Sequence, residues 1–267
     1  MTSTETFQIP LETAEVYEAR FVPGLFAEWA PLLTDAAGVR PGHAVLDVAC
    51  GTGVVTRAVA DRLGGDGTVV GLDLNESMLT VARRVRPDLA WQQGDVAHLP
   101  FPERTFDVTL CQMSLMFFPD RGRALAEMAR VTAPGGTVGI VVPAAISDQP
   151  AYHGVVSVIA DEAGAEGASL VQTYWSCGDL RELQDLFESA GLTSVTARTH
   201  TGTAHFDTID GLVITEVEGS PLIDRIDDAT YRRITERSRE VLARFVTGDG
   251  ALHAPLVGHI VTGIVPA

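Results

Sequence analysis

The sequence predicts an α/β fold built on a mostly parallel sheet, and three observations support that prediction. Short apolar runs alternate with helical patterns between residues 43 and 142. Three successive runs each end in an acidic residue, at Asp47, Asp73 and Asp95. The first run leads directly into a turn, Gly51 to Gly53, that opens a helix. Strands and helices that alternate at this spacing imply βαβ units with right-handed crossovers.

The N-terminal part is expected to be helical. Apolar residues recur at helical spacings over residues 11–37, and Pro23-Gly24 is expected to break this helix into two pieces. Asn75 or Ser77 is placed to cap a following helix, and Asp120 to cap a later one. Strands are expected near residues 43–48, 67–73, 89–93, 105–112 and 136–142. Helices are expected near residues 54–63, 75–85 and 120–132.

The second half of the chain departs from this alternation. Residues 143–177 are apolar with interspersed Gly and Ala, which favours a helical lid over another strand–helix unit. An amphipathic helix is expected over 179–190 and ends at Gly191, and residues 207–247 are expected to be mostly helical. The last strands are expected near 192–206 and 256–265.

Composition restricts the chemistry. The chain has 267 residues, 46% of them apolar, which is enough to bury a full core. Its formal net charge is −16, and every cationic side chain other than histidine is arginine. The absence of lysine excludes Schiff-base chemistry and the phosphate-binding lysine of a P-loop. The acidity disfavours nucleic acid and anionic membranes as partners, because both require clustered cations.

Other features bear on the cellular setting. No uninterrupted run of 18 apolar residues predicts a membrane span, and Met1–Glu5 shows no secretory signal. Cys50, Cys111 and Cys177 have neither zinc-ligand spacing nor a disulfide pattern, so we expect a reducing cytoplasm and no metal.

The Gly turn predicts a ligand site. A strand, a Gly turn and a helix N-terminus present backbone N–H groups, and Asp47 beside them favours a ligand that carries positive charge. Asp73 follows Gly51 by 22 positions, close to the spacing of a ribose-binding carboxylate. Thr56 occupies the third Gly position of the dinucleotide pattern, which argues against a nicotinamide or flavin dinucleotide and thus against an oxidoreductase.

Four segments in order, Val45–Gly53, Gly71–Leu79, Gly94–Phe101 and Thr105–Met113, resemble the motifs of class I S-adenosylmethionine-dependent methyltransferases. The resemblance is to the small-molecule branch that includes the ubiquinone/menaquinone-biosynthesis methyltransferases. It implies S-adenosylmethionine as cofactor. It also implies a Rossmann-like, seven-stranded, mostly parallel sheet with helices on both faces, an antiparallel last strand and helical lid insertions.

The resemblance also suggests how the chain is organised. N-terminal helices and the S-adenosylmethionine-binding core would occupy 1–142, and the lid 143–177. The core would continue over 178–206, followed by a helical insertion over 207–255 and the final strand over 256–267.

Cofactor-binding residues are carried over from the family's motifs and N-terminal helix. Asp73 would accept hydrogen bonds from the ribose hydroxyls, and Asp95 would bind the adenine amino group. Tyr17 would cover the methionine end. Capping or turn roles for the two acids, and simple packing for Tyr17, are the alternatives. The full set is Tyr17, Asp47, Ala49, Gly51, Gly53, Asp73, Leu74, Met78, Asp95, Val96 and Gln112.

Acceptor-binding residues are expected after the fourth strand and in the lid. Met113, Met116 and Phe117 would form an adaptable apolar wall, and Tyr152 and Trp175 would line a roof, with ordinary packing as the alternative. His153 and His205 are the candidate bases, although a lone histidine is more often structural.

The expected activity is methyl transfer from S-adenosylmethionine to a small, partly apolar organic acceptor, with O-, C- and N-methylation all open. The alternative is an S-adenosylmethionine-binding module or a rearrangement catalyst that transfers no methyl group. We expect a small-molecule substrate, no nucleic acid, no membrane insertion and, through the inserted helices, a possible homodimer.

Overall fold

A computed structural model describes residues 9–267, so Met1–Glu5 lie outside the described residues. The strands are β1 (Ala44–Val48), β2 (Thr68–Asp73), β3 (Ala90–Gln93), β4 (Phe106–Gln112), β5 (Thr132–Pro143), β6 (Thr193–Phe206) and β7 (Leu252–Ile264). The α-helices are α1 (Leu11–Val16), α2 (Trp29–Ala36), α3 (Val54–Leu63), α4 (Glu76–Val85), α5 (Arg121–Val131), α6 (Tyr152–Val171), α7 (Leu180–Ser189), α8 (Ile209–Glu218) and α9 (Asp228–Leu242).

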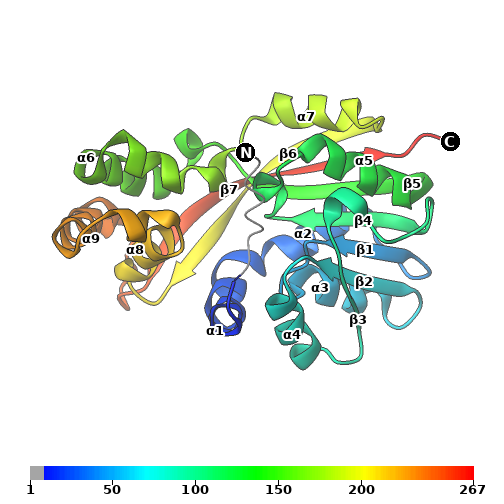
Figure 1. Ribbon diagram of the computed structural model, residues 1–267, viewed down its shortest axis with the longest axis horizontal. Coiled ribbons are helices and arrows are strands. Elements are labelled where there is room, and N and C mark those ends of the chain that lie inside the picture. Colours follow the sequence, from blue (N-terminus) through cyan, green and yellow to red (C-terminus); the bar gives the residue numbers. More distant parts are fainter. Residues whose placement is uncertain (1–8) are drawn as a thin grey trace. The chain divides into compact units, whose positions relative to one another are not determined.

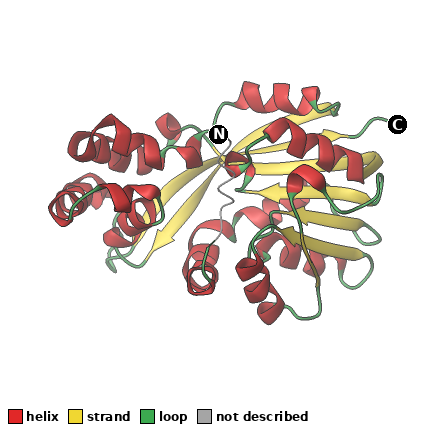
Figure 2. Ribbon diagram, viewed as in Figure 1, coloured by secondary structure: helices red, strands yellow, loops and turns green. Residues whose placement is uncertain are grey.

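Shorter helices of other types join these elements. A π-helix, η1 (Tyr17–Phe26), continues α1. The 3₁₀ turns are η2 (Val96–His98), η3 (Leu115–Phe117), η4 (Ile146–Asp148), η5 (Thr173–Trp175), η6 (Pro221–Arg225) and η7 (Ala243–Phe245). Figure 2 shows the resulting alternation of helices and strands by colour.

The seven strands form one mixed sheet in the order β3-β2-β1-β4-β5-β7-β6 (Figure 1). β1 lies inside the sheet because Val45, Leu46 and Val48 are fully buried, as expected for a parallel strand covered on both faces. β1 to β5 run parallel, and β7 is antiparallel, since Gly135 donates to the Val265 carbonyl while Ala144 donates to that of Val257. The predicted Rossmann-like sheet with an antiparallel last strand is therefore confirmed.

The predicted strands and helices of residues 43–142 are present. Asn75 caps α4 by accepting from the Ser77 and Met78 amides, and Asp120 caps α5. β5 begins at Thr132, earlier than the strand expected near 136–142, and so includes Pro134, Gly135 and Gly136. The reason lies at Gly136, where a Cβ would come within 2.6 Å of the Asp107 carbonyl, so the missing side chain permits close strand approach.

The predicted break at Pro23-Gly24 is wrong. Both residues lie inside the π-helix η1, and the chain leaves helical pairing only at residues 27–28. The wider turn explains this, because Ala27 donates to the Val22 carbonyl, five residues back. π-turns of this kind often occur at functional sites.

The structure divides into two units. The first contains residues up to Val142, Leu180–Arg198 and His259–Ala267, and the second contains Pro143–Asp179 and Thr199–Gly258. β6 and β7 each pass from one unit into the other, so part of the segment expected to continue the core over 178–206 belongs to the second unit. No described helix is both long enough and apolar enough to cross a membrane.

The second unit is built mainly from α6, α8 and α9. α6 packs against α9 at Gly154, where a Cβ would lie 2.3 Å from Val241 Cγ1. Glu162 of α6 accepts from Arg233 and Arg237 of α9 at 2.7 and 2.8 Å. The helices expected within 143–177 and 207–247 are thus present, while the role of 143–177 as a lid stays a prediction.

Candidate functional site

The turn after β1 has a backbone that favours glycine. Ala49, Gly51 and Gly53 have φ values of 53°, 56° and 92°, in the left-handed region. A Cβ on Gly53 would lie 2.2 Å from the Trp91 ring, and one on Gly71 of β2 would lie 2.6 Å from it. The Trp91 indole therefore packs directly against the turn, a contact that the sequence pattern does not indicate.

Asp47 lies next to the end of β1 and is almost completely buried, with 1% of its surface exposed. Thr56 Oγ1 of α3 donates to Asp47 Oδ2 at 2.6 Å. The pKa of Asp47 is raised from 3.8 to about 7. Burial is the largest cause, the hydrogen bond from Thr56 acts in the opposite direction, and the nearby charge of Asp73 raises the pKa further. Thr56, read from the sequence only as a missing glycine, is thus the hydrogen-bond partner of the first acid.

Asp73 ends β2 and holds the turn in place. The Gly51 amide donates to Asp73 Oδ2 and the Asn75 amide donates to Oδ1, each at 2.8 Å. Burial raises the pKa of Asp73 and outweighs the opposite effect of these two hydrogen bonds. Each carboxylate oxygen has further acceptor capacity, so a ligand hydroxyl can bind without breaking the bonds to the turn.

Asp95 follows the end of β3 and is exposed. Its Oδ1 accepts from the Ala97 amide at 2.9 Å, which makes it the cap of η2, the structural role left open by the sequence. Val96 begins η2 and is partly buried, and Leu74, after β2, is 37% exposed. Because β3, β2 and β1 are neighbours and parallel, the three acids lie at one edge of the sheet.

Tyr17 of η1 lies over the Gly turn. Its hydroxyl and Cε1 are each 3.7 Å from the position that a Cβ on Gly51 would take. The ring stacks on Phe26 at 5.3 Å between centroids, and it contacts the cluster of Ala14 and Met78. Burial, followed by the charge of Asp73, raises the pKa of Tyr17 well above its usual value, so the hydroxyl is neutral at physiological pH.

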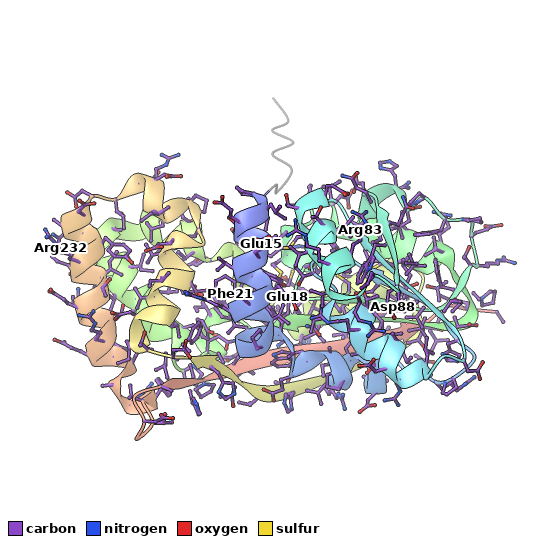
Figure 3. The ribbon with its side chains drawn as sticks, turned by 90° about the horizontal axis from the view of Figure 1, so that it is seen from below. Glu15, Glu18, Phe21, Arg83, Asp88 and Arg232 are labelled. Atoms are coloured by element: carbon purple, nitrogen blue, oxygen red, sulfur yellow. The ribbon has the colours of Figure 1, made fainter. Side chains whose placement is uncertain are left out.

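An ion pair fastens this helix to the turn. Arg57 Nη2 of α3 donates to Glu18 Oε1 at 3.0 Å, and Arg57 Nη1 donates to the Thr52 carbonyl at 2.8 Å. The two charged side chains are only 18% and 22% exposed. Figure 3 labels Glu15 of α1 and Glu18 of η1, the helix that continues α1; Glu15 forms a separate, half-exposed pair with Arg84 of α4.

The segment after β4 is mostly buried. Met113 and Met116 are 6% and 3% exposed, whereas Phe117 is 42% exposed. The Gln112 side chain donates through Nε2 to the Phe26 carbonyl at 3.0 Å, while its buried Oε1 has no partner within residues 9–267. Gln112 was expected to contribute only backbone groups; the structure shows that its side chain also ties β4 to η1.

The remaining predicted residues belong to the second unit. Tyr152 and Trp175 are in contact, with ring centroids 4.9 Å apart, and both are buried. His153 is exposed on α6. His205 packs edge-on against His253 at 4.5 Å. Within residues 9–267 no group of three or more His, Cys, Asp or Glu is placed to hold a metal ion.

Comparison with known proteins gives consistent matches. A family described as "Methyltransferase domain" matches residues 45–136. Demethylmenaquinone methyltransferase of Lysinibacillus sphaericus is 33% identical over 180 residues, covering 62% of this chain and 76% of the relative. Ubiquinone/menaquinone biosynthesis C-methyltransferase UbiE of Saccharophagus degradans is 39% identical over 124 residues, covering 44% of this chain and 50% of the relative. Against several such relatives the chain spans about half of their length.

Solved structures show the same fold. Phosphoethanolamine N-methyltransferase 2 of Haemonchus contortus, in complex with S-adenosyl-L-methionine, aligns with a TM-score of 0.62 at 18% identity, covering 97% of this chain and 58% of that one. The YcgJ protein of Bacillus subtilis aligns with a TM-score of 0.61 at 20% identity, covering 90% and 99%. At these identities the likeness establishes the fold.

Proposed function

This chain belongs to the class I S-adenosylmethionine-dependent methyltransferases, and on that premise we propose that it transfers a methyl group from S-adenosylmethionine to a small, partly apolar organic acceptor. The observation that carries the proposal is the edge formed by Asp47, Asp73 and Asp95, with the Gly turn beside it and Tyr17 over the turn. Sheet edges of this kind are where open α/β folds bind ligands.

The residues at this edge of the sheet suit S-adenosylmethionine as a ligand. The turn has no Cβ at Gly51 or Gly53 and lets a ligand approach the backbone closely. Asp47 and Asp73 offer negative charge and hydrogen-bond acceptors to a ligand with an ammonium group, a sulfonium and ribose hydroxyls. The buried Gln112 Oε1 supplies one more acceptor without a partner among the described residues.

The roles of the individual residues follow from their positions. Asp73 would accept from the ribose hydroxyls, Leu74 and Met78 would lie against the adenine, and Asp95 with the Val96 amide would bind its amino group. Asp47 and the backbone of Ala49 and Gln112 would hold the methionine end under Tyr17. These assignments are supported by the motif order and by the edge that the three acids share.

When bound, S-adenosylmethionine supplies an activated methyl group on a sulfonium leaving group. The chain must then align the acceptor with that group and exclude water. Met113 and Met116 present buried apolar side chains suited to the second task, and Phe117 offers an exposed apolar surface to an acceptor. A strong base is needed only where the acceptor must lose a proton, with His153 and His205 as the candidates.

The proposal also covers the cellular compartment and the partners of the enzyme. The three cysteines are buried and form no disulfide among the described residues, which supports a reducing cytoplasm, and a net charge of −16 supports action without nucleic acid. Pairing of two chains through the helices of residues 207–255 stays part of the proposal, to be checked by light scattering.

The experiment is a two-stage measurement. Calorimetry with S-adenosylhomocysteine tests the cofactor site, and transfer of a labelled methyl group from S-adenosylmethionine into a host extract tests the activity. Binding followed by transfer of the label to a small molecule supports the proposal. Binding without transfer to any acceptor would favour the binding-module alternative, and absence of binding would exclude both.

A further inference from the structure

Two histidines lie opposite each other on the neighbouring strands β6 and β7, in the parts of these strands that belong to the second unit (Figure 1). The ring centroids of His205 and His253 are 4.5 Å apart, and the ring planes are inclined by 80°. The strand register agrees with this contact. Thr196 and Thr262 are joined by a hydrogen bond of 2.8 Å, and the histidines follow nine residues later on β6 and nine residues earlier on β7. Side chains directly opposite in an antiparallel pair are close neighbours on one face.

Both imidazoles are exposed and keep their ring nitrogens free for a ligand. Among the residues that the structure describes, neither His205 nor His253 forms a side-chain hydrogen bond or an ion pair. Imidazole is the commonest metal ligand in proteins and suits zinc, copper and nickel ions. Because a metal–nitrogen bond is about 2.0–2.1 Å long, a single ion can reach two imidazoles whose rings are in contact.

The charge of the chain favours a cation at such a pair. The formal net charge is −16, which raises the local concentration of positive ions near the surface. Within residues 9–267 no group of three or more His, Cys, Asp or Glu is placed around one point, so the pair itself is the full set of protein ligands. Water would occupy the remaining coordination positions of a bound ion.

We propose that His205 and His253 together chelate one divalent ion of the late first-row transition metals, the class that includes Zn²⁺, Ni²⁺ and Cu²⁺. The observation that carries the proposal is the contact of two exposed, otherwise unbonded imidazoles on opposite strands. The site lies wholly in the second unit and uses no residue of the sheet edge that holds the three acids. It is therefore independent of the proposed methyltransferase function.

The position of the pair gives the ion a structural effect. His205 comes at the end of β6, shortly before α8, and His253 comes at the start of β7, after α9 and η7. A bound ion would join the two ends of this helical segment and stabilise its folded state by mass action. An imidazole that holds an ion cannot accept a proton, so His153 would be the remaining histidine candidate for a base.

Titration calorimetry tests the site on the full chain, first stripped with a chelator and then titrated with zinc chloride. The unaltered chain is expected to bind one ion. His205→Gln and His253→Gln should each weaken binding at least about tenfold, because a chelate becomes a single ligand. His153→Gln removes another exposed histidine of the same unit and is the matched control expected to keep the affinity. Circular dichroism verifies that each variant is folded.

Two further measurements distinguish chelation from binding to single histidines. With Cu²⁺ in place of zinc, pulsed electron paramagnetic resonance should count two imidazole ligands in the unaltered chain and one in either His205→Gln or His253→Gln. The melting temperature of the unaltered chain should rise by about 5 °C when free zinc is about one hundred times its dissociation constant. The same zinc concentration should leave His253→Gln close to its metal-free value.

Three results would each overturn the assignment: equal zinc affinity in the unaltered chain and the two variants, a loss in His153→Gln as large as in His205→Gln, or one ion shared between two chains in light scattering. S-adenosylhomocysteine binding is measured on the same samples. If that cofactor product binds while zinc chelation is absent, only this inference fails. Absence of cofactor binding with an intact zinc site would instead count against the proposed function.

Discussion

Asp47 of β1 and Thr56 of α3 are joined by a buried hydrogen bond of 2.6 Å, in which the Thr56 hydroxyl donates to the Asp47 carboxyl group. Among the interactions that influence the pKa of Asp47, Thr56 provides the only hydrogen bond from a side chain. This bond also explains why a threonine stands where a dinucleotide-binding turn would need glycine, since a glycine there would leave Asp47 without that donor.

Thr56→Val keeps the shape of the side chain and removes the donor. We expect the free energy of unfolding to fall by about 1–3 kcal/mol, the usual effect of leaving one buried polar group unpaired. Chemical denaturation monitored by circular dichroism measures the change. Thr56→Ser, which retains the hydroxyl, is the control and should stay close to the unaltered protein; equal losses in both variants would contradict the role of the bond.

The raised pKa of Asp47 predicts a pH dependence of stability without ligand. Its folded-state pKa is about 7 against an ordinary value of 3.8, so the folded state holds the proton more tightly. This contribution is fully present below the ordinary value and is lost as pH rises through about 7. The melting temperature should therefore fall between pH 5 and 7.5, and Asp47→Asn should flatten that fall. An unchanged slope in Asp47→Asn would exclude Asp47 as its source.

Asp73→Ala should weaken binding of S-adenosylhomocysteine by about 1–3 kcal/mol, because hydrogen bonds from ligand hydroxyls to a carboxylate are lost. Calorimetry gives the dissociation constant directly. Asp73 also holds the Gly51 amide, so Asp73→Asn, which keeps one acceptor, separates loss of charge from loss of the turn. A dissociation constant unchanged in both variants would remove Asp73 from the site.

Gly53→Ala and Gly51→Ala form a matched pair. Both residues have positive φ, and a Cβ in that region costs about 1–3 kcal/mol on its own. Only the Gly53 Cβ would also strike Trp91, at 2.2 Å, whereas the Gly51 Cβ would meet Tyr17 at an ordinary 3.7 Å. Denaturation should therefore show the larger loss for Gly53→Ala. Trp91→Leu should restore part of the difference, and equal losses would refute the close packing.

Glu18→Gln should loosen the N-terminal helix. The ion pair with Arg57 is mostly shielded from solvent, and its removal is expected to cost about 0.5–1 kcal/mol. Hydrogen exchange over residues 11–26 should then be about two- to fivefold faster. Glu15→Gln, which breaks the half-exposed pair with Arg84, is the control and should have a smaller effect. Figure 3 labels both glutamates.

The sequence predicted the sheet well because its signals are local. Apolar runs, the caps Asn75 and Asp120, and the acids that end β1 and β2 depend on residues close in the chain. The contact of Trp91 with Gly53 and Gly71 was not predictable, because it depends on the side-chain packing of two neighbouring strands. The same holds for Glu18 and Arg57, which are 39 positions apart.

Two further features had weaker sequence signals. The π-helix runs through Pro23, where a break was expected, and its hydrogen bond from Ala27 to the Val22 carbonyl spans five residues, a pattern that helical periodicity does not reveal. Glu162 of α6 and Arg233 of α9 form an ion pair across 71 positions of sequence, so nothing in their local spacing indicated the contact.

The position of Trp91 has a practical consequence. Its indole lies in van der Waals range of the glycines of the turn, so its emission should report any molecule that settles there, without an attached dye. Trp29→Phe and Trp175→Phe would remove the two other indoles of the chain and leave this natural optical sensor to follow loading and release in real time.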